Sequence, residues 1–188
     1  MILPIYAYGQ AVLKQVGKEI SADYPNLDTL IANMWETMYN AHGVGLAAPQ
    51  IGLAIRLFVI DTEQIKDEED DTLGFKKVFI NAQILEETGR VWAYEEGCLS
   101  IPNVRGDVER AANIKIKYFD EHFKEHIEDF DGIDARVIQH EYDHIEGLLF
   151  TEKLKPLKRK LISRKMEDIR NGKARADYKI KFAVGRVM

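Results

Sequence analysis

Residues 133–147 read Ile-Asp-Ala-Arg-Val-Ile-Gln-His-Glu-Tyr-Asp-His-Ile-Glu-Gly, and this stretch decides how the chain is interpreted. Its apolar residues recur at helical spacing, and Gly147 is a natural C-terminal stop. We therefore predict an amphipathic helix over 133–146 that turns both of its histidines, His140 and His144, toward the interior.

The segment His140-Glu141-Tyr142-Asp143-His144 matches the pattern HEXXH. Residues four apart on a helix project in the same direction, so the two imidazoles can bind one metal ion. Glu141 lies beside them, where a carboxylate can take a proton from water that a metal has acidified. The pattern arises by chance at a rate on the order of 1% in a chain of this size, and two buried histidines without a metal would be costly to satisfy. The pattern therefore predicts a catalytic divalent metal ion.

A catalytic site of this kind normally has a third protein ligand. No histidine follows His144, and Glu146 and Glu152 look like a helix end and a surface residue. The one cysteine, Cys98, is the remaining soft ligand, and a thiolate with two imidazoles suits zinc or iron. Cys98 could instead be a small buried hydrophobe or the nucleophile of a Cys–His hydrolase. The HEXXH pattern argues against the nucleophile, because a coordinated thiolate is not free to attack.

Residues 43–50, Gly-Val-Gly-Leu-Ala-Ala-Pro-Gln, form a second unusual segment. Its small residues let a chain or ligand approach the backbone closely, but a plain helix-to-strand turn would explain it equally well. It lacks the ending of a phosphate loop. Gln50 is its one side chain able to donate hydrogen bonds to a developing oxyanion.

The remaining elements are typical of an α+β fold, because short strands surround the helices without a βαβ repeat. Hydrophobic spacing predicts a helix over 26–42, strands over 55–60, 78–85, 114–118 and 123–129, and a basic helix over 157–171. The last sixteen residues are expected to form a tail. His122 and His126 fall in a polar hairpin and are expected to be solvated, and residues 66–72 are expected to be an acidic surface loop.

Composition favours one domain in a reducing compartment. The chain has 188 residues, 46% of them apolar, and a single cysteine, which excludes an internal disulfide framework. No apolar run is long enough to span a bilayer, and the N-terminus lacks the features of a signal peptide. We therefore expect a cytoplasmic protein with no membrane partner.

The net charge of −5 conceals an uneven distribution. Residues 153–188 carry thirteen Lys or Arg and three acidic side chains, whereas the rest of the chain is strongly acidic. Such an arm either meets an anionic partner or is a solvated helix face, and charge alone does not separate the two.

Three segments in order, 43–50, Glu96-Gly97-Cys98-Leu99-Ser100 and 140–144, resemble the signature motifs of the peptide deformylases. The resemblance extends from the N-terminus to about Leu154. It implies an α+β fold with antiparallel β-sheets around a central HEXXH helix and a C-terminal helix. It also implies an enzyme that removes the formyl group from the N-terminal formylmethionine of nascent polypeptides and releases formate.

The resemblance assigns a role to each matching residue. It implies that Cys98, His140 and His144 bind the metal, that Glu141 is catalytic, and that the Gln50 side chain and the Leu99 amide bind the oxyanion. The remaining matches are Val44, Gly45 and Leu46 at the substrate, and an ion pair of Glu96 with Arg110 that braces the cysteine loop.

The resemblance further implies Fe²⁺ as the metal, for which Ni²⁺, Co²⁺ or Zn²⁺ can substitute. Residues 1–154 would be the catalytic domain, and residues 155–188 a basic helix and tail appended to it. In related bacterial enzymes a C-terminal helix docks on the ribosome, which makes the ribosome a possible partner of the basic arm.

Two alternatives compete with this interpretation. The first is an HEXXH zinc metallopeptidase, which lacks a convincing third ligand after His144. The second is a non-catalytic metal-binding or ribosome-associated module, which would need neither Glu141 nor Gln50.

Overall fold

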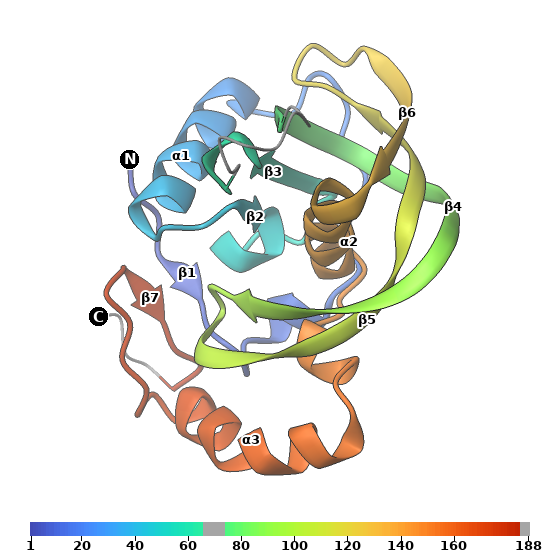
Figure 1. Cartoon of the computed structure of the whole chain (residues 1–188). Helices are drawn as coiled ribbons and strands as arrows, with labels where there is room; N and C mark the ends of the chain where they lie inside the picture. Colours follow the sequence, from blue (N-terminus) through green and yellow to red (C-terminus); the bar gives the residue numbers. More distant parts are fainter. Residues whose placement is uncertain (66–73, 185–188) are drawn as a thin grey trace.

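A curved antiparallel sheet of five strands frames the fold (Figure 1). The computed structural model describes residues 1–65 and 74–184, so the expected acidic loop over 66–72 lies outside the described residues. The strands follow the order β2 (Gly45–Ala47), β3 (Leu57–Asp61), β4 (Lys76–Cys98), β5 (Ile101–Phe119) and β6 (Glu125–Asp131). Each pairs antiparallel with the next, which leaves β2 and β6 as edge strands. The predicted α+β class is confirmed.

The helix α2 (Gly132–Ile145) lies inside the curve of this sheet, with β2 and β3 on one side and β4 and β5 on the other (Figure 1). It starts directly after β6. Its buried residues Ala135, Ile138 and Ile145 pack in one apolar cluster with side chains of β3, β4 and β5. Because the helix is enclosed, its orientation is set by packing, and the predicted helix over 133–146 is confirmed within a residue at each end.

The strands β4 and β5 are much longer than expected and form one extended hairpin. Bulges between Ile80 and Gln83 and between Thr88 and Val91 bend it around α2. The middle of β4 is largely exposed, and the inward positions of β5 include Gly106 and Arg110 as well as Val108. The alternation of apolar and polar residues therefore predicted only the segments 78–85 and 114–118 of these two strands.

The helix α1 (Leu27–Asn40) covers the other side of β2 and β3 and confirms the helix predicted over 26–42. Its buried Ile31, Met34 and Met38 belong to a cluster that includes Leu46 of β2. Within the described residues, short 3-10 helices connect the larger elements, namely η1 (Ala11–Lys14), η2 (Ala48–Ile51), η3 (Glu63–Ile65) and η4 (Phe150–Glu152).

The C-terminal residues pack into the core of the protein, whereas the sequence predicted a helix followed by a tail. The predicted basic helix is present as α3 (Pro156–Arg170). The expected tail is instead partly a strand, β7 (Ile180–Lys181), which pairs in parallel with β1 (Ile5–Tyr6). Ile180 and Phe182 are fully buried with residues of α3 and β5, because these apolar side chains fill a cluster that α3 alone leaves open. The boundary at 154 between a catalytic domain and an appendage stays a prediction.

The hairpin between β5 and β6 corrects a smaller expectation. His122 is exposed, as expected, but His126 is not simply solvated: its Nε2 lies 2.7 Å from Asp120 Oδ2, and its ring stacks on Tyr118. Among the described residues, none of the helices is both long and apolar enough to cross a membrane.

Candidate metal and active site

The side chains of Cys98, His140 and His144 meet at one point. Their ligand atoms all lie within 4.8 Å of one another, and Cys98 Sγ is 3.3 Å from His144 Nε2. The Nδ1 atom of His140 contacts a carboxylate oxygen of Glu96 at 2.9 Å, which fixes the ring with Nε2 available to the site. One thiolate and two imidazoles fit a divalent zinc or iron ion with an open fourth position. The fold thus unites three residues that are 46 positions apart at the extremes.

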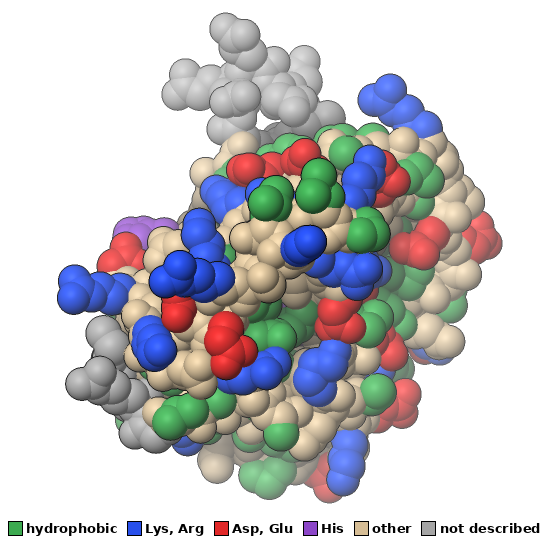
Figure 2. Space-filling model, turned by 90° about the horizontal axis from the view of Figure 1, so that it is seen from below, with side chains coloured by type: hydrophobic (Ala, Val, Ile, Leu, Met, Phe, Trp, Pro, Cys, Tyr) green, Lys and Arg blue, Asp and Glu red, His purple; other side chains and the backbone are tan. Residues whose placement is uncertain are grey.

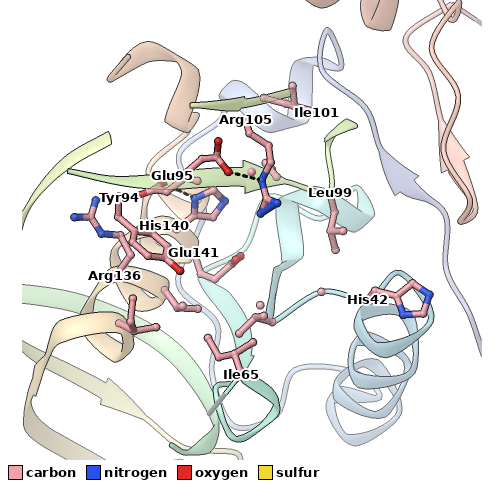
Figure 3. Close-up of a pocket in the computed structure, with 18 of the residues that line it drawn as sticks. His42, Ile65, Tyr94, Glu95, Leu99, Ile101, Arg105, Arg136, His140 and Glu141 are labelled. Carbon is pink, nitrogen blue, oxygen red and sulfur yellow. Dashed lines mark hydrogen bonds and ion pairs between the residues drawn. The ribbon is translucent and has the colours of Figure 1, made fainter. Parts of the chain in front are cut away.

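Cys98 reaches the helix because of where the long hairpin turns. It is the last residue of β4 and is paired with Ile101, so Leu99 and Ser100 form the two-residue turn into β5. Leu99 projects from this turn into the same cleft that His140 and Glu141 of α2 face (Figure 3).

Glu96 is the centre of a buried network next to the histidines. Its carboxylate accepts hydrogen bonds from Arg110 at 2.7 and 3.0 Å and from Arg136 at 3.1 Å. Arg110 also donates to Asp143 at 2.8 Å. Burial alone would raise the pKa of Glu96, but its hydrogen bonds with His140 and Arg110 outweigh burial and hold this pKa well below its usual value. Glu96 and Arg110 form the expected ion pair, and the network around them includes Arg136 and Asp143 of α2.

The side chain of Glu141 is enclosed near the Leu99–Ser100 turn that follows Cys98, called the cysteine turn below. The residue is 4% exposed, and its Oε2 atom has no hydrogen-bond partner among the described residues. Burial raises the pKa of Glu141 to about 7, which suits a group that takes up and returns a proton near neutral pH. Gly45 of β2 lies directly against it: a Cβ atom on Gly45 would be 2.5 Å from Glu141 Oε1.

Gln50, at the N3 position of η2, is held with its amide nitrogen toward the metal ligands. Its Oε1 accepts a hydrogen bond from the Ala47 N–H at 2.8 Å, which determines the orientation of the amide. Its Nε2 then lies 3.3 Å from Ser100 Oγ and 3.5 Å from Cys98 Sγ. A donor in this position can stabilise an oxyanion that forms beside the metal ligands.

An open cleft of about 1320 Å³ leads to these residues and is large enough for a stretch of peptide. Val44, Gly45, Gln50 and Leu99 line it together with Cys98, His140 and Glu141. Leu46 does not: its side chain is fully buried in the cluster against α1. Neighbouring residues of a strand point to opposite faces, so Leu46 packs toward α1 whereas Gly45 faces Glu141 of α2.

Four residues near the site escaped the sequence analysis or were left undecided. Arg136, one turn before His140, is buried, donates to Glu96 and stacks over the Trp92 ring at 4.6 Å. Asp143, inside the HEXXH segment, is buried and pairs with Arg110. Ser100 and Tyr178 bond to Gln50 and to the Leu99 carbonyl. Helical spacing could have singled out Arg136, but nothing in the sequence connects Tyr178 with Leu99.

Comparisons with known proteins agree with this geometry. The family model described as polypeptide deformylase matches residues 2–160. The chain belongs to the polypeptide deformylase family. A peptide deformylase of Flavobacterium johnsoniae is 56% identical over 193 residues, which cover 99% of this chain and 98% of the relative. One from Cytophaga hutchinsonii is 53% identical and covers 98% and 99% of the two chains.

Solved structures agree as well. The crystal structure of a peptide deformylase from Legionella pneumophila matches with a TM-score of 0.79 at 37% identity, over 93% of this chain and 99% of that one. Members of the family remove the formyl group from an N-terminal methionine, so this chain is a metal-dependent hydrolase that acts on the N-formyl group of nascent polypeptides.

Proposed function

We propose that Cys98, His140 and His144 bind the catalytic ion of this deformylase and that the ion is Fe²⁺, with Ni²⁺, Co²⁺ or Zn²⁺ able to replace it. The convergence of the three ligand atoms within 4.8 Å carries this proposal. When bound, such an ion supplies Lewis-acid chemistry, polarising an oxygen atom and acidifying water. Affinity does not favour iron over zinc, so the preference for iron rests on the family resemblance.

Glu141 is proposed as the group that moves the proton. Its enclosed carboxylate faces the cleft beside His140, where it can accept a proton from the attacking water and deliver it to the departing amine nitrogen. The restricted space beside Gly45 supports this role, because it holds the carboxylate in one place.

When water adds to the formyl carbon, negative charge develops on the formyl oxygen. This oxyanion is proposed to receive hydrogen bonds from Gln50 Nε2 and the Leu99 N–H. Gln50 is oriented by Ala47, and Leu99 directly follows a metal ligand. Both donors therefore have fixed positions before substrate arrives, which is the condition for strong transition-state stabilisation.

The peptide itself is proposed to lie along β2. This strand pairs with β3 on one side only, so its second edge is available to an extended peptide backbone. Val44 and Gly45 line the cleft at this edge. We do not assign Leu46 to the substrate, because it is buried. Glu96 and Arg110 are proposed to hold the cysteine turn against α2.

The competing metallopeptidase would need a third ligand after His144. Glu146 instead pairs with Arg56 at 2.6 Å, and Glu152 pairs with Lys14 at 2.5 Å. Formate release from a short formyl-Met peptide tests the proposal. The assay is run anaerobically on the wild type and on Glu141→Ala, with metal content measured in both. We expect formate from the iron-loaded wild type only, and no formate from it would contradict the proposal.

The ribosome is proposed as the partner of α3, and the cytoplasm as the place where the enzyme meets nascent chains. The face of the molecule that carries α3 displays many Lys and Arg side chains (Figure 2). On α3 itself Lys160, Arg164 and Lys165 are exposed, and such cations can contact the phosphates of ribosomal RNA.

Charge reversal tests this partner better than truncation, because Ile180 and Phe182 belong to the core. We expect Lys160→Glu/Arg164→Glu to lose co-sedimentation with ribosomes. The control Lys18→Glu/Lys124→Glu has the same change in charge on exposed positions elsewhere. Equal sedimentation of the two double variants would rule α3 out.

A further inference from the structure

The turn that carries Leu99 is held from both ends of the chain. The Tyr8 N–H, next to β1, donates to the Ser100 carbonyl at 2.8 Å. The Tyr178 hydroxyl, just before β7, donates to the Leu99 carbonyl at 2.6 Å. Both carbonyl groups of this two-residue turn are therefore fixed by segments that lie far from it in the sequence.

The segment that supplies Tyr178 is itself anchored. β7 pairs with β1, and the Ile5 N–H donates to the Lys179 carbonyl at 2.8 Å. Asn103 Nδ2, on β5, donates to the Arg175 carbonyl at 3.0 Å. In Figure 1, β7 lies beside β1 and close to the turn from β4 into β5. The backbone on both sides of Tyr178 is therefore anchored, which holds the Tyr178 hydroxyl next to the turn.

The same segment borders the active-site cleft, which residues 175–178 help to line. Tyr178 lies beyond residues 2–160, which the family model matches, and outside the three sequence motifs. Tyr178 is partly buried, and burial raises the pKa of its hydroxyl well above the usual value. The hydroxyl keeps its proton at neutral pH and remains a donor.

We propose that Tyr178 is a positioning residue for deformylation, which acts through the Leu99–Ser100 turn. Its hydrogen bond fixes the peptide plane between Leu99 and Ser100. The Leu99 N–H lies in the preceding plane, between Cys98 and Leu99, and only the two backbone dihedral angles of Leu99 separate the two planes, so the bond limits the direction of this N–H through those angles. The Leu99 side chain packs against Gly43, where the absence of a Cβ atom leaves room for its Cδ1 atom. This inference rests on the proposed role of the Leu99 N–H.

Tyr178→Phe tests the proposal, because it removes one hydroxyl and keeps the ring. Tyr24→Phe is the matched control: Tyr24 is also partly buried, and its hydroxyl has no hydrogen-bond partner among the described residues. In iron-loaded, full-length enzyme we expect kcat of Tyr178→Phe to fall about three- to tenfold, as for the loss of one hydrogen bond. KM should stay within about twofold, because the substrate cleft is otherwise intact.

A spectroscopic measurement separates positioning from general stability. In the zinc-loaded protein we expect the amide ¹⁵N and ¹H shifts of Leu99 and Ser100 to change in Tyr178→Phe and not in Tyr24→Phe. Unchanged kcat together with unchanged shifts would overturn the inference. So would shift changes spread over the whole protein, because these would show a loss of stability instead. A wild type that releases no formate would contradict the proposed function, whereas the amide shifts would still report on the hydrogen bond.

Discussion

Gly45 and Glu141 share one space, since a Cβ atom on Gly45 would lie 2.5 Å from Glu141 Oε1 and 2.7 Å from Glu141 Cδ. The glycine does not supply an unusual backbone conformation here, because β2 is an ordinary paired strand at this position. It supplies room. The carboxylate is therefore confined between β2 and α2.

Gly45→Ala is expected to displace Glu141, lowering kcat about 100-fold and the unfolding free energy by about 1–3 kcal/mol. The two effects are separable in a double-mutant cycle. In the Glu141→Ala background the clashing atoms are gone, so Gly45→Ala should destabilise much less. Formate release and denaturant unfolding measure the two quantities. Additive losses of stability in the cycle would show that the two residues do not compete for space.

Glu96→Ala should destabilise the protein by about 3–5 kcal/mol, because Arg136 is left buried without a carboxylate and Arg110 keeps only Asp143. The neighbouring Glu95 is the control. It pairs with Arg105 at 3.4 Å, but both side chains are more than half exposed. Glu95→Ala is expected to change stability by at most about 0.5 kcal/mol. Denaturant melts of both variants measure the difference, and equal losses would refute a stabilising network around Glu96.

Gln50→Ala is expected to lower kcat by about 10²–10³, because one oxyanion donor is lost. KM and the bound metal should be nearly unaffected, since Gln50 is not a ligand. Gln64→Ala is a suitable control, because within residues 1–65 and 74–184 this exposed amide donates to the Gly43 and Asp61 carbonyls and not to any residue at the metal ligands. Steady-state kinetics with a formyl-Met peptide measure both. A Gln50→Ala enzyme with wild-type kcat would remove Gln50 from the mechanism.

Cys98→Ala and His144→Ala are each expected to lose the metal, which elemental analysis of the purified protein would show as a drop from about one ion per chain. Removing the metal should not unfold the protein, because three clusters of buried apolar side chains surround the site. Far-UV circular dichroism before and after chelation checks this. A Cys98→Ala protein that keeps a full complement of metal would contradict the ligand assignment.

Short-range patterns in the sequence determined a large part of this protein. Helical spacing located α1, α2 and α3, and the i, i+4 spacing in HEXXH predicted that His140 and His144 bind one metal ion. The resemblance of the three motifs implied roles for Cys98 and Gln50, which the structure brings within 3.5 Å of each other. The helix predictions are confirmed because helical spacing depends on residues within a few positions of one another, where backbone geometry acts directly.

The tertiary structure decided whatever depends on contacts between distant segments. Leu46 became a core residue because α1 packs on its face of β2. Asp143 and Arg136 became members of the Glu96 network because β4 and β5 curve around α2. The middle of β4 is exposed and β5 turns an arginine inward, so the hydrophobic pattern predicted only the segments 78–85 and 114–118 of these two strands. Tyr178 reaches Leu99 across 79 positions through the pairing of β7 with β1. Hydrophobic periodicity shows which face of an element is buried, but only packing decides which residues then meet.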